Sequence, residues 1–173
     1  MVDAGRYPRS LSHIGIGVDD IESTVEWYEE VLGLNRVLGP EKIKAGEEHI
    51  GTLLAAVDQP PDFEWIKLAL LSTGDHVGVE FYEFDQQDQK ADDGRRPGLS
   101  HFCIQDPNIE QLAADIEANG GEHIEEVWQI LPEKPYKMTY CKDPFGNVLE
   151  IHTHGFEQTH ANLHSLKDPE TQQ

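Results

Sequence analysis

The chain contains two histidines and two glutamates whose recurrence suggests a metal site. The tripeptide Leu-Ser-His occurs twice and ends at His13 and at His101. Each copy is followed, later in the chain, by an apolar segment that carries a glutamate, Glu80 in the first case and Glu150 in the second. Imidazole nitrogens and carboxylate oxygens suit a divalent zinc, nickel, cobalt, manganese or iron(II) ion better than calcium. Two similar halves that bring these four side chains together would hold one such ion.

The joint recurrence of these residues favours ligation over the ordinary alternative. A single histidine on the polar face of a strand is more often exposed or hydrogen-bonded to a neighbour than bound to a metal. Here each histidine opens an alternating apolar segment, and each glutamate lies in a later one. The histidines are further apart than the glutamates because the first half carries an insertion between about residues 39 and 64.

Hydrophobic periodicity in the first half predicts one helix among several strands. Residues 12–18 alternate, with the aliphatic side chains on the face opposite His13. Asp19 or Asp20 then offers an N-cap for an apolar stripe at helical spacing, and Gly33 is a plausible C-terminal stop. The further strands predicted in this half are residues 35–38, 66–71 and 76–84, with a turn at 73–75 before the last.

The second half repeats this order. Residues 100–105 alternate with His101 and Cys103 on the face opposite Phe102 and Ile104. Asp106 is predicted to cap a helix that ends at Gly120-Gly121. The strands predicted after it are residues 125–130, 136–142 and 147–153, the last following a type I turn at 143–146.

The predicted fold is α+β, with two tandem βαβββ modules that form a curved mixed-sheet cup around a metal site. In each module the histidine and the glutamate lie on the face that the helix leaves uncovered. The insertion at 39–64 is predicted to be a lid or a disordered loop, and the C-terminal segment a frayed or partner-packed extension. The expected division is a first module at 10–85, a linker at 86–97, a second module at 98–154 and a polar extension at 155–173.

Composition limits the partners and the compartment. The formal net charge is −20, which argues against nucleic acid or an anionic membrane surface as a partner. No apolar run approaches the length of a membrane span, and no secretion signal is recognisable at the N-terminus. The two cysteines, Cys103 and Cys141, form no disulfide framework and are expected to be small buried hydrophobic residues. We therefore expect a cytoplasmic protein.

The duplicated module resembles the vicinal oxygen chelate superfamily. The resemblance rests on the two histidine motifs at 11–16 and 99–102 and on the run Asp-Pro-Phe-Gly-Asn-Val-Leu-Glu at 143–150, and it covers residues 10–154. Members include glyoxalase I, methylmalonyl-CoA epimerase, extradiol dioxygenases and fosfomycin or bleomycin resistance proteins. The four ligand positions of the superfamily fall on residues already singled out: His13, Glu80, His101 and Glu150.

The resemblance implies a metal-dependent lyase, isomerase or epimerase acting on a small substrate with adjacent oxygens. In that chemistry a carboxylate moves a proton at the carbon next to a carbonyl, and Glu150 or Glu80 is the expected base. Glu47 or Glu48 in the insertion is a further candidate, although a solvated acidic loop is the simpler interpretation. A homodimer is also implied, with the modules paired within one chain or exchanged between chains.

Two other functions stay open. An iron(II) extradiol ring-cleaving dioxygenase is favoured by Tyr140, which matches part of that signature, but no histidine stands shortly before it and a fourth ligand at Glu80 would occupy an open position. A non-catalytic small-molecule-binding resistance protein is the other alternative, and retention of all four ligands argues against it. His152 and His154 extend the Glu150 face as possible cavity-lining residues or as surface histidines at a strand end.

Overall fold

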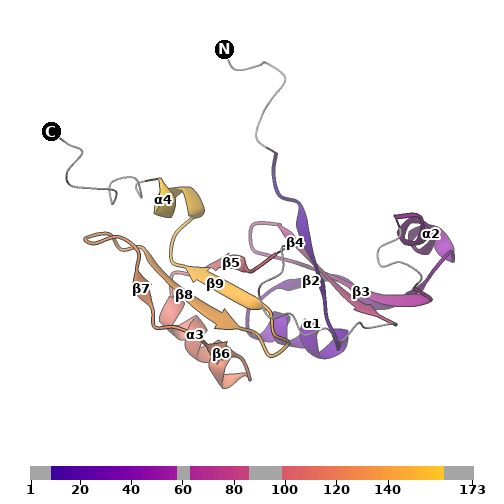
Figure 1. The fold of residues 1–173 in the computed structure, drawn as a ribbon, viewed down its shortest axis with the longest axis horizontal. Helices are drawn as coiled ribbons and strands as arrows, with labels where there is room; N and C mark the ends of the chain where they lie inside the picture. Colours follow the sequence, from indigo (N-terminus) through magenta and orange to yellow (C-terminus); the bar gives the residue numbers. More distant parts are fainter. Residues whose placement is uncertain (1–8, 58–62, 86–98, 162–173) are drawn as a thin grey trace, which may run out of the picture. The chain divides into compact units, whose positions relative to one another are not determined.

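The computed structural model describes residues 9–57, 63–85 and 99–161. The chain divides into two compact units, Met1–Gln89 and Lys90–Gln173. Each unit contains a βαβββ core with one sheet, and Figure 1 shows the elements along the chain. No helix in the described ranges is long and apolar enough to cross a membrane.

The first unit is a four-stranded mixed sheet with two helices. Its sheet order is β1-β4-β3-β2, in which β1 runs parallel to β4 and the other neighbours are antiparallel. The elements are β1 (His13–Gly17), α1 (Ile21–Glu30), β2 (Asn35–Lys44), α2 (Glu48–Val57), β3 (Trp65–Ser72) and β4 (Gly78–Phe84).

Helix α1 packs on β2, β3 and β4 of this sheet (Figure 1). Asp20 is the N-cap, and its carboxylate accepts a hydrogen bond from the Ser23 N–H. Ile21, Val25 and Tyr28 are 0% exposed, as their helical spacing predicts. Burying each such side chain stabilises the fold by about 1.5–3 kcal/mol. The N-cap and the stripe together set where the helix begins and which face it turns to the sheet.

Strand β2 and helix α2 correct the prediction for the insertion. Residues 39–64 were expected to be a lid or disordered loop, whereas β2 continues to Lys44, which pairs with Trp65 of β3, and α2 follows at 48–57. The register shifts twice along β2, so the alternation that identifies a strand is interrupted there. Gly39 has φ +79° and a Cβ there would lie 2.2 Å from the Leu68 carbonyl oxygen. Residues 58–62 of the insertion lie outside the described residues.

The second unit is a five-stranded mixed sheet. Its order is β5-β9-β8-β6 with β7 also paired to β8, and β5 runs parallel to β9. The elements are β5 (Phe102–Gln105), α3 (Ile109–Ala118), β6 (Glu122–His123), β7 (Trp128–Gln129), β8 (Lys137–Lys142), β9 (Val148–His152) and α4 (Phe156–His160).

Helix α3 covers one face of this sheet, and its start differs from the prediction. It packs on β6 and β8 through Ile109, Leu112, Ala113 and Ile116, all buried (Figure 1). The N-cap is Asn108 rather than Asp106, since the Asp106 carboxylate accepts the Asn108 N–H at 2.7 Å and so closes a turn before the helix.

Two other predictions for the second unit were wrong in part. The strand expected at 125–130 is replaced by two-residue strands at 122–123 and 128–129, because β8 pairs with both in separate places. The extension from residue 155 was expected to be frayed or packed on a partner. Residues 156–160 instead form α4, so this part is not frayed, and residues 162–173 lie outside the described range.

The turn before β9 is built by Asp143, which is 3% exposed. Its carboxylate accepts the N–H groups of Phe145 and Asn147 and the side-chain amide of Asn147. Gly146 takes φ +94°, a backbone conformation that glycine adopts readily. This turn sets the register of β8 against β9, in which Tyr140 lies opposite Glu150. The predicted α+β fold of two βαβββ modules with mixed sheets is confirmed, and neither sheet is closed.

Candidate functional site

In the first unit the predicted ligands His13 and Glu80 lie near each other. Strands β1 and β4 pair in parallel, with His13 opposite Gly78 and Gly15 opposite Glu80. The His13 Nε2 atom is 3.8 Å from Glu80 Oε2, and the two side chains are 53% and 25% exposed. A Cβ at Gly78 would lie 2.9 Å from the His13 Cβ, so the position opposite the histidine must be small. Tyr82 donates a hydrogen bond to Glu80 Oε2 at 2.5 Å.

In the second unit His101 and Glu150 form a closer pair. His101 directly precedes β5, Glu150 lies in β9, and the distance from His101 Nε2 to Glu150 Oε2 is 3.1 Å. Tyr140 donates a hydrogen bond of 2.8 Å to the other carboxylate oxygen, Oε1. The Tyr140 ring also stands edge-on to His101, with centroids 5.7 Å apart.

The histidines of the two units share a second contact. The Nδ1 atom of His13 is 3.4 Å from the Ser12 hydroxyl, and Nδ1 of His101 is 3.0 Å from the Ser100 hydroxyl. In each ring the serine hydroxyl therefore lies beside Nδ1, and Nε2 faces the glutamate. Such a contact on the far nitrogen orients metal-binding histidines in proteins. Each unit therefore presents one oriented imidazole beside one carboxylate.

Hydrogen bonding keeps Glu150 ionised and the tyrosines protonated. Burial alone would raise the pKa of Glu150, but the hydrogen bond from Tyr140 and the nearby His152 imidazole outweigh it and hold that pKa below its ordinary value. Burial and the bond to Glu150 raise the pKa of Tyr140 to about 12. The pKa of Tyr82 is raised in the same way, by burial and by Glu80. Both hydroxyls therefore remain donors at neutral pH, each to a carboxylate.

The sequence profile described as the Glyoxalase/Bleomycin resistance protein/Dioxygenase superfamily matches residues 10–151. The chain belongs to this superfamily. Its sequence finds no significant match among curated proteins. The resemblance to the vicinal oxygen chelate superfamily inferred from the histidine motifs is confirmed.

Solved structures of superfamily proteins share the fold at low identity. A glyoxalase family protein from Bacillus cereus has a TM-score of 0.65 at 18% identity, covering 87% of this chain and 97% of that one. A glyoxylase/bleomycin resistance protein/dioxygenase domain from Frankia has a TM-score of 0.61 at 17% identity, covering 86% and 100%. The fosfomycin resistance protein FosX from Listeria monocytogenes has a TM-score of 0.57 at 15% identity, covering 90% and 99%. At these identities the likeness establishes the fold alone.

The second unit of this superfamily member contains two further donors beside Glu150. Cys103 lies opposite Glu150 in the pairing of β5 with β9, and it is exposed, so its prediction as a small buried hydrophobic residue was wrong. Cys141 is buried as predicted. His152 is only 3% exposed, and its Nε2 lies 3.1 Å from Glu150 Oε1.

The alternation of the strands indicated the side of these donors but not their burial. Residues 101 and 103 share a face, as do 150 and 152, so their proximity to Glu150 follows from the pattern. The His152 ring stacks on His160 of α4 at 5.5 Å, and the sequence offered no signal for that helix. His154 instead lies half-buried, beside the Tyr136 ring and the Thr153 hydroxyl.

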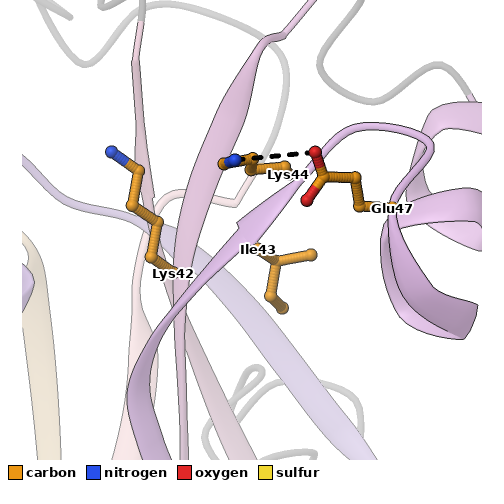
Figure 2. A pocket seen from close by; sticks show the side chains of 4 residues that line it. All are labelled: Lys42, Ile43, Lys44 and Glu47. Carbon is orange, nitrogen blue, oxygen red and sulfur yellow. Dashed lines mark ion pairs between the residues drawn. The ribbon is translucent and has the colours of Figure 1, made fainter.

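Glu47, a further candidate base, lies in a different part of the first unit. It is exposed and pairs with Lys44 at 3.5 Å. Figure 2 shows it with Lys42, Ile43 and Lys44 around a pocket of about 170 Å³. None of the predicted ligands lines this pocket. Glu48 begins α2.

Another acidic group in the first unit has a structural explanation. Carboxylate oxygens of Asp20, Glu22 and Glu83 lie within 4.8 Å of one another. The Lys67 ammonium contacts Glu22 at 2.9 Å and Glu83 at 3.0 Å, and Glu83 also accepts the Ile21 N–H. An internal cation and a helix N–H therefore already satisfy this group.

Proposed function

We propose that this chain is a metal-dependent enzyme of the glyoxalase type. One divalent ion is held by His13, Glu80, His101 and Glu150, and a small substrate binds to it through two adjacent oxygens. The reaction is a proton transfer of the lyase, isomerase or epimerase class. The observation that carries the proposal is the pairing, in each unit, of one oriented imidazole at or just before the first strand with one carboxylate on the last strand.

The residues fit a divalent ion. Both Nε2 atoms point at glutamate oxygens, at 3.8 Å and 3.1 Å, and each far nitrogen has a serine hydroxyl beside it. An ion binds nitrogen and oxygen ligands at ~2.0–2.2 Å, so within each unit it would take the place of the direct contact between imidazole and carboxylate. A single-residue mutant of FosX has been solved with Mn(II) and 1S,2S-dihydroxypropylphosphonic acid, a ligand with hydroxyls on neighbouring carbons. That precedent supports both the ion and the adjacent-oxygen substrate proposed for this chain.

The roles of the two glutamates differ in the proposal. A bound ion would supply Lewis-acid stabilisation of negative charge that develops on the substrate oxygens. Glu150 is held by Tyr140 on one oxygen and by His101 on the other, which suits a fixed ligand. Glu80 accepts the Tyr82 hydroxyl but lies further from its histidine and is more exposed, so a substrate carbon can reach it more readily and it is the proposed base. A positioned base of this kind contributes roughly 10²–10⁴-fold to the rate.

Tyr140 is a positioning residue in this scheme. Its hydroxyl contacts Glu150, and its raised pKa keeps it a donor rather than a base. Glu80 and Glu150 therefore account for the proposed chemistry. A homodimer, in which the modules pair within one chain or are exchanged between chains, is part of the same proposal.

The test combines manganese binding with proton exchange. Mn²⁺ prefers carboxylate and imidazole ligands to thiolate, so its stoichiometry reports this site. We expect one ion per chain, lost in His13→Ala and in His101→Ala, with His49→Ala as the control because His49 is an exposed histidine outside the set. Retention of Mn²⁺ affinity within about threefold in both ligand variants would overturn the proposed site.

Proton exchange tests the reaction. The Mn²⁺-loaded protein is incubated in D₂O with a panel of α-hydroxy carbonyl compounds, and deuterium at the α-carbon is followed by NMR. We expect exchange with at least one compound, and its loss in Glu80→Gln when Mn²⁺ is raised until that variant is saturated. Oxygen uptake with catechol in the iron(II)-loaded protein, without α-proton exchange, would replace this reaction with ring cleavage.

A further inference from the structure

We propose that the second unit carries a metal site of its own, formed by Cys103, Glu150 and His152, which takes a thiophilic divalent ion such as zinc or cobalt. This goes beyond the proposed function, which uses Glu150 but neither Cys103 nor His152. Because one carboxylate serves both ligand sets, the ion's identity decides which set is used.

The strand register brings the three ligand atoms together. Cys103 lies directly opposite Glu150 in the β5–β9 ladder, and His152 follows two residues later on the same face. The Cys103 Sγ, a Glu150 oxygen and a His152 nitrogen lie within 4.8 Å of one another. A tetrahedral zinc site with bonds of ~2.0–2.3 Å places its ligand atoms about 3.3–3.6 Å apart. Side-chain rotations that move each ligand atom by about 1 Å would therefore bring the three atoms to the separations of a zinc site.

The His152 ring provides the second, independent observation. Its Nε2 atom is buried and, among the residues that the structure describes, has no partner in hydrogen-bonding geometry. It faces Glu150 Oε1 at 3.1 Å, and the residue is 3% exposed. A buried polar atom left without a partner destabilises the folded state. A metal bond at Nε2 would satisfy this atom, and the stacked His160 ring covers the imidazole from the side.

The first unit lacks these donors at the equivalent positions. Gly15 stands opposite Glu80 where Cys103 stands opposite Glu150, and Tyr82 takes the place of His152. A Cβ at Gly15 would lie 3.3 Å from the Tyr82 ring, so the tyrosine occupies the space that a cysteine would need. The two units thus have the same histidine–glutamate pair, but only the second adds a thiol and a further imidazole. A thiolate ligand favours soft ions such as zinc over harder ions such as manganese.

The test is cobalt(II) titration of the full chain in a reducing, oxygen-free buffer. A cysteine ligand gives a thiolate-to-cobalt charge-transfer band in the near ultraviolet, which a site of histidine and glutamate alone cannot produce. We expect the band in the unsubstituted protein and in Cys141→Ser, and its loss in Cys103→Ser. Absence of the band in the unsubstituted protein, or its persistence in Cys103→Ser, would overturn the proposal.

Measurement of zinc affinity tests the same site quantitatively. Loss of an outer-shell partner costs 10–100-fold in affinity, so loss of a ligand in Cys103→Ser should cost more than about 100-fold. A smaller loss would overturn the site. The double variant His13→Ala, Glu80→Gln separates the two proposals: it should lose Mn²⁺ binding if the proposed function holds, and it should keep the cobalt band if this site holds. Circular dichroism checks that each variant is folded. Because Cys103 is exposed, we expect the protein to tolerate its substitution.

Discussion

Replacing Asp143 by alanine should destabilise the second unit by about 3 kcal/mol. The carboxylate accepts three hydrogen bonds, from the N–H groups of Phe145 and Asn147 and from the Asn147 side-chain amide, at 3.0, 2.7 and 2.7 Å. A donor left unsatisfied costs about 1–3 kcal/mol. Phe145 and Asn147 are only partly buried, so water would satisfy some of these donors. We therefore take about 1 kcal/mol for each of the three donors, the low end of that range.

The assay is urea unfolding followed by circular dichroism, with Asp143→Asn as the matched control. Both backbone N–H groups bond to Oδ1, so asparagine can keep them and lose only the acceptor of the Asn147 amide. We expect about 1 kcal/mol for Asp143→Asn. For a chain of this size 1 kcal/mol corresponds to about 2–4 °C in Tm, so alanine should lower Tm by about 6–12 °C. A loss below about 1 kcal/mol for alanine, or equal losses for both variants, would refute the assigned hydrogen bonds.

Three further predictions follow from single contacts. Tyr140→Phe removes the donor that fixes Glu150 and should weaken Mn²⁺ binding about tenfold; unchanged affinity in a competition titration would remove its positioning role. Asp20→Ala should cost about 1 kcal/mol at pH 7 in urea unfolding. Hydrogen bonds from the Ser23 backbone and hydroxyl lower the pKa of Asp20 below 3.8, so this difference should be complete above that pH and vanish as the pH falls through the lowered value; a difference that grows in acid would contradict the cap. Ile116→Ala, at a side chain 0% exposed, should cost about 2–5 kcal/mol, and a cost under 1 kcal/mol would show that α3 does not pack as described.

Most of the fold was predictable because its elements alternate or repeat locally. The helix stripe that includes Ile116 and the strand alternation around His13 depend on side chains a few residues apart, which sequence periodicity reports directly. Strand β2 was underestimated because its register shifts hide the alternation. Helix α4 is only five residues long and has no side-chain cap, so no local signal marks it.

The sequence predicted which face of the sheet carries the site residues, but not how deeply each of them is buried. Alternation placed Glu150 opposite the aliphatic side chains, and the structure puts it against His101 and Tyr140. The burial of His152 depends on α4, which covers it through His160. Exposure of Cys103 could not be predicted, because cysteine is commonly buried and only the tertiary structure shows what covers each side of a strand.

The stoichiometry of Mn²⁺ measured by electron paramagnetic resonance tests the central claim most directly. We predict about one ion per chain in the unsubstituted protein, and less than about a tenth in either His13→Ala or His101→Ala, since a ligand is lost in each. His49→Ala should bind normally. Full Mn²⁺ occupancy in both ligand variants would contradict a metal centre that draws one imidazole and one carboxylate from each unit.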